Sequence, residues 1–305
     1  MLKDGQLIIP EARIETTNAC QARCTVCARE RMTRPLTTLC WGHFVSIIDQ
    51  FQRLGGKAVS LFGFGEPLLD KGLIEKVQHC GDLGLTTYIT TNGQALTINK
   101  SKRLLAAGLK NIRFSIHAIS PKDYMDVHKG LDWLTVWRNL ANFLYQNKKE
   151  GHPCKVHLSV IPMHEERVID IRRTWEKYVD FLEVWRPHNW GGAKSFRAVF
   201  NHKTTCGRPF NGPLQIQADG NVIPCCFLTN GEVILGNTYE KTIKDILLDE
   251  PYHRLQEAHR TGNLKGYPCE NCDQRNEDQG NILLYSSRDP EKKTGVTSSC
   301  KLPVT

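Results

Sequence analysis

Three cysteines near the start of the chain, Cys20, Cys24 and Cys27, are spaced Cys-x3-Cys-x2-Cys. Cysteine runs that hold iron–sulfur clusters supply one thiolate to each iron. A run of three therefore leaves one iron of a four-iron cluster open to a small molecule, as a catalytic metal site requires. The alternatives are three structural thiols, or a zinc site completed by a distant side chain. Zinc sites more often show paired Cys-x2-Cys units.

A second set of cysteines lies in the last third of the chain. It consists of Cys206, Cys225, Cys269 and Cys272. The last two form a Cys-x2-Cys pair, and four thiolates in one small module predict a closed site for zinc or for an iron–sulfur cluster. The spacing by itself slightly favours zinc.

The first set must be positioned by the elements around it. From residue 12 to about 185, short apolar runs alternate with amphipathic ones. The predicted strands are Arg13–Thr17, Ala58–Phe62, Thr86–Thr90, Asn111–Ile116, Lys155–Ile161 and Phe181–Trp185. The predicted helices are His43–Leu54, Leu69–Leu83, Lys100–Ala107, Trp133–Asn147 and Glu166–Tyr178. This alternation predicts a parallel α/β sheet, as a full or partial barrel of six βα units. Ligands bind at the carboxyl ends of such strands, and the three-cysteine loop follows the first of them.

After Trp190 the pattern changes to short segments broken by Gly, Pro and Asn. A hairpin is predicted from Leu214 to Ile223 with its turn at Asp219-Gly220, followed by helices over Ile243–Leu248 and Tyr252–Arg260. Apolar residues are few here, and such modules usually need a metal to hold them together. The predicted division is a core over residues 1–190, a Cys-rich module over 191–280 and a tail over 281–305, polar and loose from Tyr285 onward.

The composition indicates a globular protein: 305 residues, 40% hydrophobic and 24% charged. No run of eighteen apolar residues predicts a membrane span, and the start of the chain lacks the pattern of a secretory signal. The twelve cysteines follow metal spacing rather than a disulfide pattern, which predicts a reducing, cytoplasmic location. The net charge of +8 is scattered, so we expect a solvated basic surface rather than a nucleic-acid interface. An anionic substrate remains open.

The Cys-x3-Cys-x2-Cys loop after the first strand resembles the radical S-adenosylmethionine (SAM) superfamily. The resemblance implies that SAM chelates the open iron of a [4Fe–4S] cluster through its amino and carboxylate groups. It also implies that the reduced cluster splits the sulfonium bond and yields a 5′-deoxyadenosyl radical. Thiolate ligation and burial depress the cluster potential, as that cleavage demands.

Further segments match the same family. Gly63-Phe-Gly65-Glu66-Pro67 is similar to its Gly-Gly-Glu-Pro segment, which implies contact with the SAM amino group. The residues Thr90 to Gly93 are similar to its Thr-Asn-Gly segment, so Thr90 and Asn92 are predicted near the nucleoside.

Three other positions are assigned by the same likeness. Ser115 and Lys129 match positions that hold the SAM carboxylate, although Lys lacks the two-pronged geometry of the Arg often found there. His117 stands where many relatives carry Asp, and we expect either contact with SAM or substrate or an ordinary half-buried histidine.

The second cysteine set resembles the SPASM/twitch extension of this family. That likeness implies one auxiliary [4Fe–4S] cluster on the four cysteines, in preference to zinc. The predicted fold is therefore an α/β protein with a partial (β/α)6 TIM-like barrel, followed by a small SPASM/twitch module with a β-hairpin and short helices. Cys226 is predicted to be a packed thiol, with hydrogen donation to a substrate radical as the alternative.

The segment after the sixth strand joins core and module, and Arg186, His188 and Trp190 are predicted either to contact substrate or to pack as a hinge. The predicted reaction abstracts hydrogen from an unactivated carbon of a small polar molecule, such as a sugar, aminocyclitol or nucleotide-sugar, and ends in dehydrogenation or epimerisation. No peptide-binding domain precedes Cys20, which favours a small substrate over a peptide or protein side chain. RNA modification and a non-catalytic metal protein are lesser alternatives. Flavodoxin or ferredoxin is the expected reductant.

Overall fold

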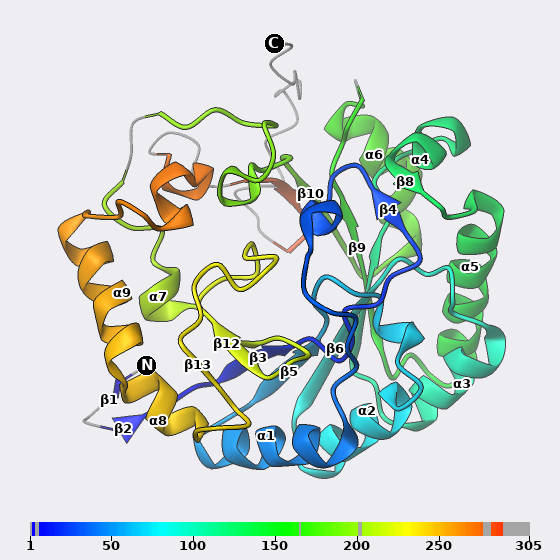
Figure 1. The fold of residues 1–305 in the computed structure, drawn as a ribbon. Helices are drawn as coiled ribbons and strands as arrows, with labels where there is room; N and C mark the ends of the chain where they lie inside the picture. The colour runs from blue at the N-terminus through cyan, green and yellow to red at the C-terminus, as the bar shows by residue number, and fades with distance from the viewer. Residues whose placement is uncertain (1, 4–5, 165, 201–202, 277–281, 289–305) are drawn as a thin grey trace.

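The computed structural model describes residues 2–3, 6–164, 166–200, 203–276 and 282–288. Six parallel strands in chain order form an open, partial barrel with helices on its outer side (Figure 1). They are β3 (Glu11–Ile14), β5 (Ala58–Leu61), β6 (Thr86–Thr91), β7 (Asn111–Ser115), β9 (Lys155–Val160) and β10 (Phe181–Trp185). Each is paired in parallel with the next, so the predicted fold class is confirmed.

The helices between these strands carry one apolar stripe each. They are α1 (Trp41–Arg53), α2 (Leu73–Asp82), α3 (Ile98–Ala106), α4 (Pro121–Val127), α5 (Trp133–Lys149) and α6 (Val168–Trp175). In α1 the buried residues Phe44, Ile47 and Phe51 recur at helical spacing, which turns the stripe toward the sheet. Helix α2 begins later than the predicted Leu69, because Pro67–Leu69 forms a 3-10 turn that the Glu66 side chain caps.

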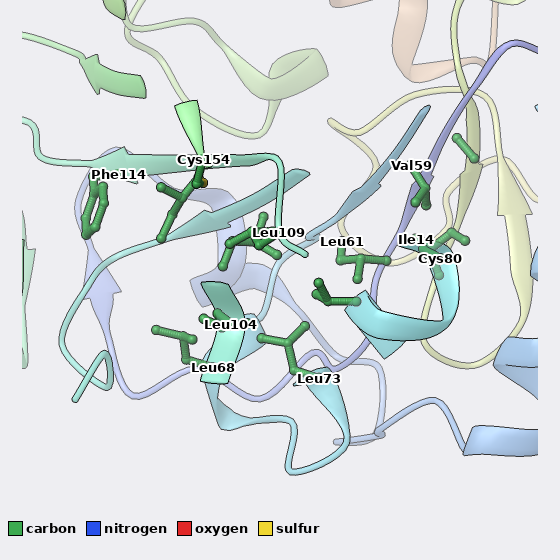
Figure 2. Packing of buried hydrophobic residues seen from close by; sticks show 14 of the residues in the cluster. Ile14, Val59, Leu61, Leu68, Leu73, Cys80, Leu104, Leu109, Phe114 and Cys154 are labelled. Carbon is green, nitrogen blue, oxygen red and sulfur yellow. The ribbon is translucent and has the colours of Figure 1, made fainter. Parts of the chain in front are cut away.

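Alternate residues of each barrel strand face opposite sides. On β5, Val59 and Leu61 are fully buried against the helices, whereas Ser60 lines a cavity inside the barrel. Figure 2 shows Leu61 in the same apolar layer as Leu73 of α2 and Leu104 of α3. The apolar core therefore lies between sheet and helices, and the inner face of the sheet is free to carry polar groups.

The predicted hairpin is confirmed as β11 (Leu214–Ile216) and β12 (Asn221–Ile223). It does not stand apart from the barrel. Strand β11 pairs in parallel with β3, Ile216 lying opposite Ile14, and β13 (Gly236–Asn237) continues the same sheet beyond β12. The open edge of the barrel offers unpaired backbone groups, and the hairpin satisfies them. The module is completed by α7 (Arg208–Asn211), α8 (Ile243–Leu248) and α9 (Glu250–Thr261), with α8 beside α1 and α9 packed against α7 and α8 (Figure 1).

The tail prediction needs a correction. Residues Leu283–Ser286 form β14, antiparallel to β10 at the other edge of the sheet, and Tyr285 is only 1% exposed. Edge pairing and burial of the Tyr ring order this segment, which sequence polarity had marked as loose. Residues 289–305 lie outside the described part of the chain. Among the described residues, no helix combines the length and apolar character that crossing a membrane requires.

Two further strand pairs are short. Strand β1 (Leu2–Lys3) pairs with β2 (Gln6–Leu7) ahead of the barrel. Strand β4 (Arg23–Cys24) pairs antiparallel with β8 (His128–Lys129), which ties the three-cysteine loop to the segment after α4.

Candidate active site

The three cysteines of the first set line one cavity of about 530 Å³ inside the barrel. The predicted cofactor residues that line it with them are Gly63, Gly65, Glu66, Thr90, Asn92, Ser115 and His117. Residues from the loop after β3 and from the ends of β5, β6 and β7 thus meet at a single site. The shared lining agrees with the rule that ligands bind at the carboxyl ends of parallel strands.

The cysteine loop is held by a buried carboxylate that sequence reasoning missed. Glu15 directly follows β3, is 3% exposed and forms a two-pronged ion pair with Arg34 at 2.9 and 3.1 Å. Its oxygens also accept the backbone N–H groups of Phe64 (2.8 Å) and Ala218 (3.0 Å). One side chain therefore joins the cysteine loop, the loop after β5 and the turn region of the auxiliary hairpin.

Two glycines are required by close backbone approach. A side chain at Gly65 would overlap the carbonyl oxygen of Thr17, and one at Gly63 would overlap the Glu15 side chain. The backbone N–H of Glu66 donates to the carbonyl of Ala19 at 2.8 Å. The predicted glycine segment thus packs directly against the cysteine loop.

Glu66 is 2% exposed and lines the cavity. Oε1 accepts from the Thr91 hydroxyl (2.7 Å) and the Leu68 backbone (3.1 Å), and Oε2 accepts from the Asn92 backbone (2.8 Å). Burial raises the pKa of this carboxyl, and the hydrogen bonds oppose the rise. The carboxylate is therefore fixed in place and has acceptor capacity left for a cationic amino group. Thr91, rather than its neighbour Thr90, holds it.

Each sulfur of the first set faces an N–H group. The contacts are Asn92 Nδ2 to Cys20 Sγ (4.0 Å), His128 Nδ1 to Cys24 Sγ (3.2 Å) and the Arg29 backbone N–H to Cys27 Sγ (3.4 Å). Burial raises the pKa of the Cys27 thiol to about 11. Without metal such a thiol stays protonated at neutral pH, and metal binding is what deprotonates it. N–H donors aimed at sulfur suit thiolate ligands of a cluster.

His117 and Lys129 are placed differently. The His117 ring lines the cavity, and its Nδ1 accepts the Ile161 backbone N–H at 3.2 Å, so the proton of the neutral ring is on Nε2. Burial lowers the pKa of His117 to about 4, which keeps the ring neutral at pH 7. Lys129 is half exposed, bonds Asp126 at 3.2 Å and is not among the residues lining the cavity.

The segment after β10 closes one side of the site. His188 and Trp190 line the cavity, and the Trp190 indole donates to the Val26 carbonyl at 2.8 Å. Trp190 has a φ of 51°, an uncommon conformation for a residue with a side chain. Burial lowers the pKa of His188 to about 3. Arg186 is not among the cavity-lining residues.

This segment also reaches the second cysteine set. The Asn189 side chain donates to the Asn271 carbonyl at 2.7 Å, and the Asn189 backbone N–H donates to Asp273 at 3.1 Å. Both partners flank Cys272. The segment therefore connects the barrel cavity with the loop that carries Cys269 and Cys272.

The four cysteines of the second set line a separate cavity. Arg208 and Arg275 lie in its wall, and their charges suit an anionic cluster of thiolates. Burial raises the pKa of Cys269 to about 11 and that of Cys272 to about 12. Within the described ranges, no three Cys, His, Asp or Glu side chains are close enough to share a single metal ion. The thiolates of a four-iron cluster bind separate irons and surround a larger centre than the ligands of one ion.

Cys226 is not among the residues that line this second cavity, although its side chain contacts Cys225 and Arg208, which are. It lines a small space of about 120 Å³ beside the barrel cavity, together with Cys27, Phe62 and Trp190. Its sulfur accepts from Arg13 Nη1 at 3.3 Å. Arg208 Nη1 contributes a second bond at 3.5 Å.

The geometry describes a partial βα barrel with an open-ended cysteine site and a second cysteine site beside it. In agreement, the radical SAM superfamily matches residues 14–174, and an iron–sulfur cluster-binding SPASM domain matches residues 206–273. The first match covers more than half of the chain, so the protein belongs to the radical SAM superfamily. Its cofactors are SAM, a [4Fe–4S] cluster and an auxiliary iron–sulfur cluster in the SPASM domain.

Curated relatives are similar over part of their length. GTP 3′,8-cyclase of Desulforamulus reducens is 26% identical over 182 residues, which cover 56% of this chain and 54% of the relative. PqqA peptide cyclase of Bradyrhizobium diazoefficiens is 30% identical over 196 residues, covering 61% and 48%. The chain thus spans about half the length of the curated relatives it matches.

Solved structures share the fold over most of the chain. BtrN in complex with AdoMet and 2-DOIA has a TM-score of 0.61 at 18% identity, covering 88% of this chain and 94% of that one. Streptococcus suis SuiB bound to the precursor peptide SuiA has a TM-score of 0.67 at 17% identity, covering 88% and 70%. At these identities the likeness shows the architecture alone.

Proposed function

We propose that the protein abstracts a hydrogen atom from an unactivated carbon of a small polar substrate and thereby dehydrogenates or epimerises it. A sugar, an aminocyclitol or a nucleotide-linked sugar is the expected class. The observation that carries the proposal is the cavity of about 530 Å³, which lies within the size range of small-molecule sites. The open face of the cluster, SAM and the substrate would have to share this cavity, which favours a compact substrate.

The inner wall of the cavity supports a polar substrate. Ser60, Tyr88 and Ser159 line it from three different strands. Arg13 lines it as well and, among the described residues, has no carboxylate within ion-pair distance, whereas Arg113 pairs with Glu183 at 3.0 Å. The Arg13 guanidinium has five N–H donors and gives one to Cys226, so donors remain for hydroxyl, carboxylate or phosphate oxygens.

When bound, the cluster and SAM would supply the radical that abstracts the hydrogen atom. The chain's own residues would orient the reactants. Glu66 would accept from the SAM amino group, and the Nε2–H of His117 would donate to an oxygen of SAM or substrate. Phe62 and Trp190 would exclude water from the reacting carbon, since both line the cavity. Flavodoxin or ferredoxin would deliver the electron in the cytoplasm.

Dehydrogenation and epimerisation are each favoured by different cysteines of the chain. One auxiliary cluster on the four cysteines of the module would accept an electron and so favour dehydrogenation. Cys226 would favour epimerisation, because it lines the space beside Cys27 and the barrel cavity and its protonated thiol could return a hydrogen atom. The hydrogen bond with Cys225 and the Arg13 and Arg208 guanidinium groups oppose this role, since they lower the pKa of that thiol. Solvent deuterium separates the two: only epimerisation places deuterium at the product carbon.

The test is an anaerobic incubation with SAM and dithionite over a substrate panel. The panel contains sugar phosphates, nucleotide-sugars, aminocyclitols and unmodified peptides. We expect 5′-deoxyadenosine release to rise with a member of the first three groups, with a product that either loses two hydrogens or takes up one deuterium. Stimulation by peptides alone would replace this proposal with peptide modification. That alternative has support in the similar PqqA peptide cyclases, whose name records a peptide substrate.

A further inference from the structure

His128 is brought to the three-cysteine site by a strand pair that links distant parts of the chain. In the β4–β8 pair, His128 lies directly opposite Cys24. Its ring nitrogen Nδ1 is 3.2 Å from Cys24 Sγ, within hydrogen-bond range for sulfur. The residue is 1% exposed and lines the barrel cavity.

The second ring nitrogen determines where the proton is. His128 Nε2 accepts the backbone N–H of His117 at 3.0 Å, so Nε2 uses its lone pair and carries no hydrogen. The remaining ring proton must then be on Nδ1, the nitrogen that faces Cys24. The contact is therefore an N–H donated to sulfur.

The ring is also held against rotation. Tyr124 stacks on one side at a centroid distance of 4.4 Å, and His117 stacks at 4.9 Å. Two stacked rings, one backbone hydrogen bond and one sulfur contact leave a single orientation. The donor is thus built into the fold before a cluster binds.

We propose that His128 is a positioning residue for the cluster of Cys20, Cys24 and Cys27, which donates its Nδ1–H to the sulfur of Cys24 and raises the reduction potential of that cluster. Hydrogen bonds to cluster sulfurs are one of the factors that set cluster potentials. Reduction adds negative charge to the cluster, so an N–H donor stabilises the reduced state more than the oxidised one. The substrate has no part in this inference.

The experiment is protein-film voltammetry of the reconstituted enzyme with and without SAM, which identifies the relevant cluster as the wave that responds to SAM. Three variants separate the two ring nitrogens. H128N keeps an N–H near the position of Nδ1, H128Q keeps an acceptor near that of Nε2, and H128F keeps only the ring face. H157F is the matched control, because His157 is a buried histidine that bonds Asn111 rather than a cluster cysteine.

We expect the SAM-responsive wave to shift to more negative potential in H128F and H128Q, and to stay near its original position in H128N and H157F. Iron content measured on the same samples identifies any variant that fails to hold the cluster. If H128F loses its iron, H128Q is compared with the parent enzyme in its place. An unshifted wave in an iron-replete H128F or H128Q would overturn the proposal. An equal shift in H128N would overturn it too, because the effect would then be structural. The absence of a SAM-responsive wave in the parent enzyme would also overturn the proposal, because no cluster whose potential His128 could raise would then be present.

Discussion

The two cysteine sites are built in opposite ways. The first draws three sulfurs from residues 20–27, and its surroundings are the barrel sheet and residues in contact with the main core. The second draws four sulfurs from three segments that lie in turns and short helices. The sheet and core position the first site, whereas the segments around the second are joined mainly by hydrogen bonds between side chains and backbone, such as those from Arg275 to the carbonyls of Lys203 (2.9 Å) and Cys269 (3.1 Å). A catalytic site with an open position needs such prior order, because its metal does not complete its own cage.

The sites nevertheless share a support. Glu15 holds the three-cysteine loop and accepts a hydrogen bond from Ala218 in the auxiliary hairpin, and Asn189 joins the barrel cavity to the loop of Cys272. The two sites are therefore linked by hydrogen bonds through Glu15 and Asn189, and changes at one can be compared with changes at the other.

The largest contrast is expected between cysteines of the two sites. C24A removes a ligand from the open-ended site and should abolish 5′-deoxyadenosine release. C269A should keep SAM cleavage and lower the iron content from about eight to about four per chain, as one of two four-iron clusters is lost. Iron analysis and chromatography of the SAM products measure both. Loss of SAM cleavage in an iron-retaining C269A enzyme would show that the sites are not separable.

The next effect concerns the shared support. E15Q removes a buried charge and leaves Arg34, at 6% side-chain exposure, with only the more distant carboxylate of Asp219 at 3.8 Å. Breaking one side of a buried pair costs about 3–5 kcal/mol, and we expect that loss in urea unfolding. The matched control is E75Q, because Glu75 pairs with Arg103 at 3.2 Å with half of each side chain exposed. That pair should contribute no more than about 1 kcal/mol. Equal losses of unfolding free energy in E15Q and E75Q would show that Glu15 does not have this structural role.

A smaller effect is expected where the backbone segments touch. G65A inserts a methyl group against the Thr17 carbonyl and should destabilise the protein by about 1–3 kcal/mol, with weaker cluster loading. G42A serves as control, because a side chain there meets no atom within 4 Å in helix α1. It should be neutral or slightly stabilising, by up to about 1 kcal/mol. Melting curves and absorbance of the cluster measure both. Normal cluster loading of the G65A protein would contradict the close approach of Gly65 to the Thr17 carbonyl.

The smallest effect is expected at Lys129. Its side chain is half exposed and pairs with Asp126, so K129A should change SAM binding by no more than about 0.5 kcal/mol. Equilibrium binding of SAM to the reconstituted enzyme measures this. A loss of tenfold or more would restore the sequence-based prediction that Lys129 holds the SAM carboxylate.

The neighbouring residues His128 and Lys129 show what can and cannot be predicted from the sequence. Cysteine spacing and βα alternation predicted the barrel and both cysteine sites, and the likeness to the family's segment implied the role of the glycine segment, since these signals are local. Successive residues of a strand point to opposite sides, so a two-residue strand sends His128 to the sulfur and Lys129 to solvent. Which one faces Cys24 depends on a pairing across 104 residues, and no local pattern records it. Glu15 was equally hidden, because its partners lie up to 203 residues away.

The edges of the sheet to which the hairpin and the tail segment pair were not predicted, for a related reason. Strand β11 joins the sheet at β3, and β14 joins it at β10, because an open barrel leaves two edges to be paired. The sequence predicted the hairpin itself from its Asp-Gly turn. It carried no signal for the edge to which either segment would pair.

The central claim is that one iron at Cys20, Cys24 and Cys27 stays open and binds SAM. Electron paramagnetic resonance of the dithionite-reduced protein, recorded with and without SAM, tests this most directly. We expect SAM to change the g-values of one cluster signal, and C24A to lack the signal that responds. A spectrum of the iron-replete protein that SAM leaves unaltered would contradict the account.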